Sequence, residues 1–152
     1  MGYKCELKEQ NIQIILTIRT NSPVQELPQV FGTSYGAIMH YLEELGESPI
    51  GAPFAAYYNM DMQNLDIEIG FPVSRKLPDK GEIKSSEIPA GKFASCLFTG
   101  PYSDIEPAYN ELTQWTKEKG YEPTGIAYEI YLNDPQITPP QELRTEIRFL
   151  LK

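Results

Sequence analysis

One acidic side chain stands in an otherwise apolar and aromatic stretch, GIAYEIYLN, over residues 125–133. The stretch is typical of a β-strand, in which residues i and i+2 share a face, so we expect Ala127, Glu129 and Tyr131 side by side. A carboxylate in such surroundings is unfavourable unless something compensates its charge. Glu129 can pair with a base, hold a proton through a raised pKa, or receive a cationic ligand.

The base in the best position for an ordinary ion pair with Glu129 is Arg148, on the strand expected to lie beside it. The sequence leaves this ion pair open as the alternative to a ligand-binding carboxylate. Arg148 is a candidate site residue in both interpretations.

The second half of the chain repeats the first. Residues 51–59 (GAPFAAYYN) match residues 125–133 at an offset of 74 (125 − 51). At this offset Tyr57 is matched by Tyr131, whereas Ala55 is matched by Glu129. The acid is therefore the point at which two related strands diverge, and this singles it out among 21 acidic residues.

Apolar periodicity and turn residues predict the same order of elements twice: strand, helix, strand, strand. We expect strands over 12–20, 54–59, 66–73, 81–87, 92–99, 125–133 and 144–151, and helices over 28–45 and 103–119, with Ser103 as N-cap and Glu106 completing a capping box.

The predicted fold class is α+β, a tandem duplication of a strand–helix–strand–strand module with mainly antiparallel sheets, two long helices and a central ligand cleft. The chain is expected to be a single domain over 1–152, with module one at about 4–74 and module two at about 81–152. One module alone is too small to bury its apolar face, so we expect the two to share a core and leave the cleft at their junction.

The chain contains 10 Tyr, 6 Phe and 1 Trp. Tyrosine-rich walls around one carboxylate suit flat, lipophilic cations, through stacking and cation–π attraction. We expect Tyr57, Tyr131 and Trp115 to line the cleft, with a purely structural core role as the alternative. Four further rings fall on periodic apolar faces and are interpreted as core: Tyr35, Phe71, Tyr109 and Phe149.

Composition argues against several function classes. A net charge of −8 with scattered bases disfavours direct nucleic-acid binding. No run approaches the length of a membrane helix, so we expect a cytoplasmic protein without a membrane partner. Cys5 and Cys96 lie far apart in sequence and form no metal or redox motif. Catalytic signatures are absent from the sequence, and we expect no cofactor and no metal.

Three stretches suggest a known family: Thr99-Gly100-Pro101-Tyr102, the run YEIYLNDP at 128–135, and GFPV at 70–73. With the doubled module, they resemble the GyrI-like small-molecule-binding superfamily, which includes effector-binding domains of AraC-type and MerR-type multidrug regulators. The resemblance covers about residues 4–151. It implies that Glu129 lies at the ligand cleft between aromatic walls and meets lipophilic cations.

No helix-turn-helix precedes residue 12, so the chain resembles the stand-alone members of that superfamily. We expect a binding protein for drug-like or dye-like molecules, acting in transcription regulation through a separate regulator as protein partner. One alternative is a hydrolase of reactive cyclopropanoid compounds that uses Glu129 with Trp115 and Tyr131. The other is a protein-binding regulator of the DNA gyrase inhibitor type.

Overall fold

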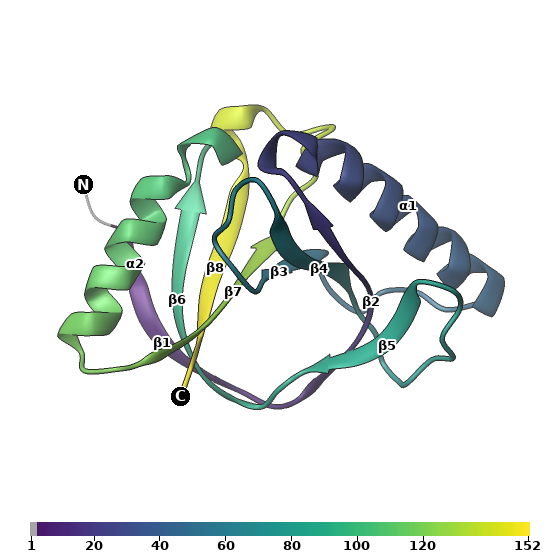
Figure 1. Cartoon of the computed structure of the whole chain (residues 1–152), viewed down its shortest axis with the longest axis horizontal. Helices are drawn as coiled ribbons and strands as arrows, with labels where there is room; N and C mark the ends of the chain where they lie inside the picture. Colours follow the sequence, from purple (N-terminus) through teal and green to yellow (C-terminus); the bar gives the residue numbers. More distant parts are fainter. Residues whose placement is uncertain (1–2) are drawn as a thin grey trace. The chain divides into compact units, whose positions relative to one another are not determined.

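The computed structural model describes residues 3–152 (Figure 1). The chain divides into two compact units. One is continuous and comprises Asn11–Ala90. The other is discontinuous, because it joins the residues up to Gln10 to Gly91–Lys152. We call them the continuous unit and the discontinuous unit.

The continuous unit is an antiparallel sheet in the order β3-β4-β2-β5 with one long helix. Its elements are β2 (Gln13–Ser22), the short 3-10 helix η1 (Val24–Glu26), α1 (Leu27–Leu45), β3 (Phe54–Tyr57), β4 (Leu65–Pro72) and β5 (Ile83–Ile88). Ile38 and Leu42 of α1 pack on Leu16 and Phe71 of the sheet. Gly46 ends α1 because its φ of 69° is left-handed, a conformation that glycine adopts without strain.

The discontinuous unit is an antiparallel sheet in the order β1-β6-β8-β7 with the shorter helix α2 (Glu106–Glu118). Its strands are β1 (Cys5–Gln10), β6 (Gly91–Thr99), β7 (Pro123–Tyr131) and β8 (Arg144–Leu151), with two short 3-10 helices, η2 (Tyr102–Asp104) and η3 (Pro140–Glu142). Ala108 and Leu112 of α2 pack on Cys96 and Ile147, and α2 runs beside β6 in Figure 1. This packing fixes α2 against the face of the sheet that carries the candidate site.

The α+β class, the mainly antiparallel sheets and the two helices are confirmed. The structure adds a strand, β1, that was not predicted. It corresponds to β5 at an offset of 78 (83 − 5), and β2 corresponds to β6 at the same offset (91 − 13). Each half of the sequence therefore reads strand, strand, helix, strand, strand.

The first strand of each half joins the unit formed by the rest of the other half. β1 pairs with β6, and β5 pairs with β2. The compact units thus group the edge strands differently from the expected modules at 4–74 and 81–152. That the whole chain acts as one domain stays a prediction.

The predicted N-cap at Ser103 is wrong. Ser103 lies within η2, α2 begins at Glu106, and no side chain caps the helix. The 3-10 turn already satisfies nearby N–H groups, because those of Asp104 and Ile105 donate to the carbonyls of Pro101 and Tyr102. Among residues 3–152, neither helix has both the length and the apolarity needed to cross a bilayer.

Candidate functional site

Glu129 lies in β7, where it faces Ile147 across the pairing with β8. Ala127, two residues earlier, is buried in the cluster that α2 packs against. Because alternate residues of a strand share a face, Glu129 is on the side of the sheet that α2 covers. The predicted alignment of Ala127, Glu129 and Tyr131 on one face is confirmed by these contacts.

Two phenols donate hydrogen bonds to the Glu129 carboxylate, one to each oxygen. The Tyr109 hydroxyl, on α2, donates to Oε2, and the Tyr131 hydroxyl, on β7, donates to Oε1 at 2.9 Å. Tyr131 is 9% exposed, so the second bond is shielded from water. Tyr109 was interpreted as a core residue, and the structure shows that its hydroxyl also belongs to the site.

Tyr102 is a further residue near Glu129, which the sequence marked only as part of a family-like stretch and not as a site residue. Its ring meets the Tyr131 ring edge-on, with centroids 5.5 Å apart. Burial raises the pKa of Tyr102, and the nearby charges of Glu129 and Asp134 raise it further. Since Tyr102 is 38% exposed, it forms an accessible edge of the tyrosine cluster around the carboxylate.

Burial also raises the pKa of Glu129, although the bonds from Tyr109 and Tyr131 act in the opposite direction. A hydrogen bond to the ionised form lowers the pKa of a carboxyl, so burial is the larger of the two opposing effects. The site is therefore a desolvated acid held by neutral donors, and a positive charge brought beside it would favour its ionised form.

The ion pair between Glu129 and Arg148, which the sequence left open as an alternative, does not form. Arg148 faces Tyr128 across the β7–β8 pairing, and so projects from the opposite face to Glu129. Its Nε donates to Glu146 at 2.6 Å. Among residues 3–152, no Lys or Arg forms an ion pair with Glu129.

The first half of the chain supplies an internal comparison. Tyr35 occupies the position on α1 that Tyr109 occupies on α2, and it donates to the Phe54 carbonyl at 2.8 Å. Ala55, the counterpart of Glu129, is fully buried in β3. The same helix tyrosine thus bonds to the backbone in one unit and to a carboxylate in the other. The pairing of the helix tyrosine with a carboxylate is therefore specific to the second half.

The GyrI-like small molecule binding domain family matches residues 3–152, nearly the full length. The chain belongs to this family. The predicted resemblance is confirmed. None of the curated proteins matches the chain.

Solved structures share the fold of this GyrI-like domain. The EcmrR C-terminal domain superposes with a TM-score of 0.82 at 22% identity, covering 100% of this chain and 99% of that one. EcmrR in a complex with DNA superposes with a TM-score of 0.86 at 24% identity over 99% of this chain. This chain spans only 57% of the length of that one. A hydrolase from Listeria innocua superposes with a TM-score of 0.71 at 16% identity, covering 98% of this chain and 92% of that one. SAV2435 bound to tetraphenylphosphonium superposes with a TM-score of 0.71 at 12% identity, covering 100% of this chain and 94% of that one.

The other predicted cleft residues of this GyrI-like domain lie elsewhere in the two units. Trp115 is six residues beyond Tyr109, about 9 Å further along the α2 axis and on another face of the helix. Its ring packs beside Tyr121, with centroids 6.3 Å apart. Tyr57 packs against the Leu65, Ile67 and Ile69 cluster of the continuous unit. That Tyr57, Ala55, Ala127, Trp115 and Arg148 contact a ligand stays a prediction.

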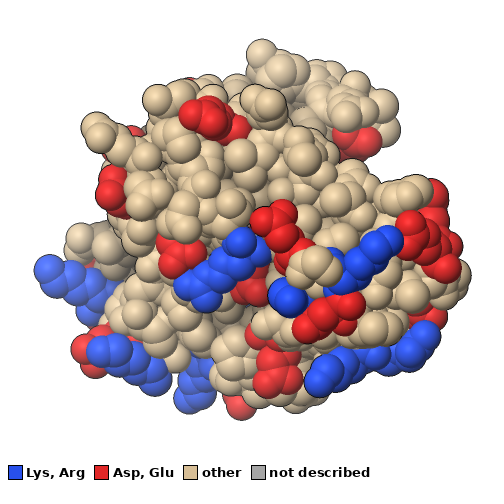
Figure 2. Space-filling view, turned by 45° about the vertical axis from the view of Figure 1, so that its right-hand side comes forward, with Lys and Arg blue, Asp and Glu red and all other residues tan. Residues whose placement is uncertain are grey.

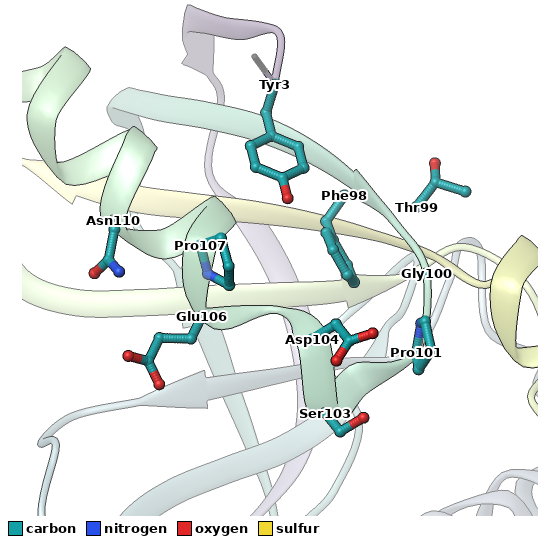
Figure 3. A pocket seen from close by; sticks show the side chains of 10 residues that line it. All are labelled: Tyr3, Phe98, Thr99, Gly100, Pro101, Ser103, Asp104, Glu106, Pro107 and Asn110. Carbon is teal, nitrogen blue, oxygen red and sulfur yellow. The ribbon is translucent and has the colours of Figure 1, made fainter. Parts of the chain in front are cut away.

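A hollow of about 550 Å³ lies at the start of α2, within the discontinuous unit (Figure 3). Tyr3, Phe98 and Pro107 supply apolar surface, and Asp104 and Glu106 supply two acids. The hollow includes Thr99, Gly100 and Pro101 of the family-like stretch, but not Glu129. We assign the candidate site to the Glu129 cluster because there burial raises the pKa of a carboxyl group that two phenols bond and no Lys or Arg pairs with among residues 3–152.

Figure 2 shows basic and acidic side chains interspersed over the face in view. This pattern agrees with the net charge of −8 and offers no continuous basic band on that face for a nucleic-acid backbone. Among residues 3–152, no group of three or more His, Cys, Asp or Glu side chains is placed to hold a metal ion.

Proposed function

We propose that this GyrI-like domain binds flat, lipophilic and often cationic small molecules, with Glu129 as the counter-charge. The observation that carries the proposal is the environment of Glu129, which is desolvated, bonded to two phenols and without a basic partner among residues 3–152. A cationic ligand supplies the charge that Arg148 does not. It replaces the solvation that the carboxylate loses on burial.

The tyrosines support the same ligand class. Tyr102 and Tyr131 present aromatic rings near the carboxylate, and aromatic faces attract cations that carry apolar groups. Among the similar structures, SAV2435 is bound to tetraphenylphosphonium, which combines a positive charge with four aromatic rings. EcmrR is found in a complex with DNA. We extend the proposal to a cytoplasmic ligand sensor that works with a separate DNA-binding partner.

The decisive experiment is a fluorescence titration of the wild type and Glu129→Gln with a cationic rhodamine and with tetraphenylphosphonium. Removing one partner of a buried charge–ligand contact weakens binding by on the order of 2–5 kcal/mol. The variant should therefore bind at least roughly 30-fold more weakly. The matched control is Glu122→Gln, which removes an acid whose side chain is 74% exposed and should leave the affinity unchanged. Equal affinities for the wild type and Glu129→Gln would refute the proposal.

A second candidate function is hydrolysis of a reactive, strained electrophile. The acid with a raised pKa is the observation that favours it, because general acid–base catalysis needs a pKa close to the working pH. A structural neighbour is described as a hydrolase, at 16% identity. A mass-spectrometric screen with cyclopropanoid compounds tests this candidate, and Glu129→Gln should abolish any turnover found. No turnover by the wild type leaves binding as the function. A gyrase-directed protein contact stays a prediction that a pull-down with gyrase would test.

A further inference from the structure

The two cysteines face each other directly. Cys5 of β1 is the register partner of Cys96 of β6, although 91 residues separate them in sequence (96 − 5). Both are free thiols; Cys5 is half-buried and Cys96 is 1% exposed. Their spacing in the sequence gives no redox motif, and only the fold makes them neighbours. Pairing of an unpredicted strand with β6 brings them together.

The backbone geometry suits a covalent link. Facing residues of an antiparallel pair have Cα atoms about 4.5–5.5 Å apart, within the range of about 4.4–6.8 Å found for disulfides. Their Cβ atoms are about 4.5–5.5 Å apart, slightly wider than the roughly 3.5–4.5 Å that a disulfide prefers. The two thiols are close enough for each to affect the pKa of the other. β1 is an edge strand, so a small approach of Cys5 disturbs pairing on one side only.

We propose that Cys5 and Cys96 are an oxidation site, at which a peroxide converts the two thiols into a disulfide that fastens β1 to β6. With hydrogen peroxide, the Cys5 sulfur attacks one oxygen and breaks the O–O bond, giving a sulfenic acid and water. The Cys96 sulfur then attacks the Cys5 sulfur and releases a second water. The two thiols lose two electrons and two protons, and one peroxide becomes two waters.

The order of the two steps follows from exposure and acidity. Cys5 is the accessible thiol, whereas burial raises the pKa of Cys96 to about 12. Burial raises the pKa of Cys5 as well, the nearby Cys96 thiol lowers it, and the charge of Glu111, facing the pair from α2, raises it. The thiolate is the reactive form, so oxidation should be slow at neutral pH and faster in mild alkali.

The position of the pair determines what the disulfide does. Cys5 is the first residue of β1, and Gln10 at the other end of the strand leads towards β2. Just beyond Cys5, the Tyr3 N–H donates to Glu111 of α2 at 2.5 Å, and the Tyr3 ring lies 6.0 Å from that of Phe98. Figure 3 shows these two rings at one side of the hollow. The disulfide therefore holds the segment around Tyr3 and Cys5 against α2.

The test is oxidation of the wild-type chain with hydrogen peroxide, read by peptide mapping without reductant and by thermal unfolding. We expect a peptide pair joined through Cys5 and Cys96 with two hydrogens fewer than the separate thiols. We also expect the midpoint of thermal unfolding to rise by about 5–10 °C, because a disulfide that closes a long loop stabilises the fold substantially. Reduction with dithiothreitol should return the midpoint to its original value. Cys5→Ser, at the half-buried position, should fold and show neither change, and Cys96→Ser is the second variant.

Three outcomes would overturn the proposal. They are a disulfide formed between two chains through Cys5, addition of oxygen to either thiol without a linked peptide, or a linked peptide with an unchanged midpoint. The dye titration reports on Glu129 and does not depend on this result.

Discussion

Removing one phenol from each half of the chain isolates the contribution of the charge at Glu129. Tyr109→Phe deletes the donor to the Glu129 carboxylate, and Tyr35→Phe deletes the matched donor to the Phe54 carbonyl. Both variants keep their rings, so the packing changes little. A hydrogen bond to a charged group contributes about 1.5–3 kcal/mol, against about 0.5–1.5 kcal/mol for a neutral pair. At a pH above the pKa of Glu129 we expect Tyr109→Phe to lower the unfolding free energy by roughly 1 kcal/mol more than Tyr35→Phe.

The pH dependence separates the charge from the shape. The bond from Tyr109 favours the ionised form, so its loss raises the pKa of Glu129 further. The difference between wild type and Tyr109→Phe should be fully present well above that pKa and should shrink as Glu129 takes up a proton. The Tyr35→Phe difference should stay constant. Urea unfolding at a series of pH values, from above the pKa of Glu129 to below it, measures both differences. Equal and pH-independent losses would refute the assignment of Glu129 as an ionised acceptor.

Three further substitutions probe the fold, one in the discontinuous unit and two in the continuous unit. Burial raises the pKa of Glu146, but bonds from Arg148, Lys8 and Ser95 outweigh it and hold that pKa at about 2. A lowered pKa stabilises the fold above the ordinary value of 4.5, and this is lost as the pH falls towards 2. Glu146→Gln should therefore lower the free energy of unfolding by about 3 kcal/mol at neutral pH, as measured with urea. The stability of this variant should also fall less steeply with pH on the acid side, and an unchanged slope there would contradict this reasoning. A Cβ on Gly70 would lie 2.3 Å from the Leu16 carbonyl oxygen, so Gly70→Ala should cost about 2–4 kcal/mol. A Cβ on Gly36 of α1 would meet open space, so Gly36→Ala should raise the free energy of unfolding by about 0.5–1 kcal/mol, measured by thermal unfolding. Similar effects at Gly36 and Gly70 would contradict the steric reasoning.

The repeat and Glu129 could be predicted from the sequence because both rest on matches between residues of one chain. Helical periodicity placed Tyr109 on the packed face of α2, but it contains no information on where a phenol hydroxyl points. Cys5 could not be paired with Cys96 because β1, with the sequence CELKEQ, is a short and mostly polar edge strand. Such strands lack the apolar run by which a buried strand is recognised.

Arg148 and Glu129 could not be placed relative to each other from the sequence. Which side chains of two strands meet depends on register, and a shift of one residue moves a side chain to the other face. The register of β7 and β8 makes Arg148 the partner of Tyr128 and Glu129 the partner of Ile147, so the two charged side chains project from opposite faces. The sequences of two strands joined by a loop do not give this register.

Because β1 and β5 each belong to the unit formed by the other half, the two units can be separated only by cuts that respect this exchange. Gln10 and Gly91 face each other across β1 and β6, so the polypeptide leaves the discontinuous unit and returns to it at one place. Topologically, residues 11–90 are an insertion at the tip of a hairpin. Replacing that insertion with a two-residue turn would join β1 to β6 directly and keep Cys5, Tyr109 and Glu129 on one short polypeptide. A cut at 74–81, where the sequence repeat suggests the boundary, would instead leave β5 on the wrong fragment.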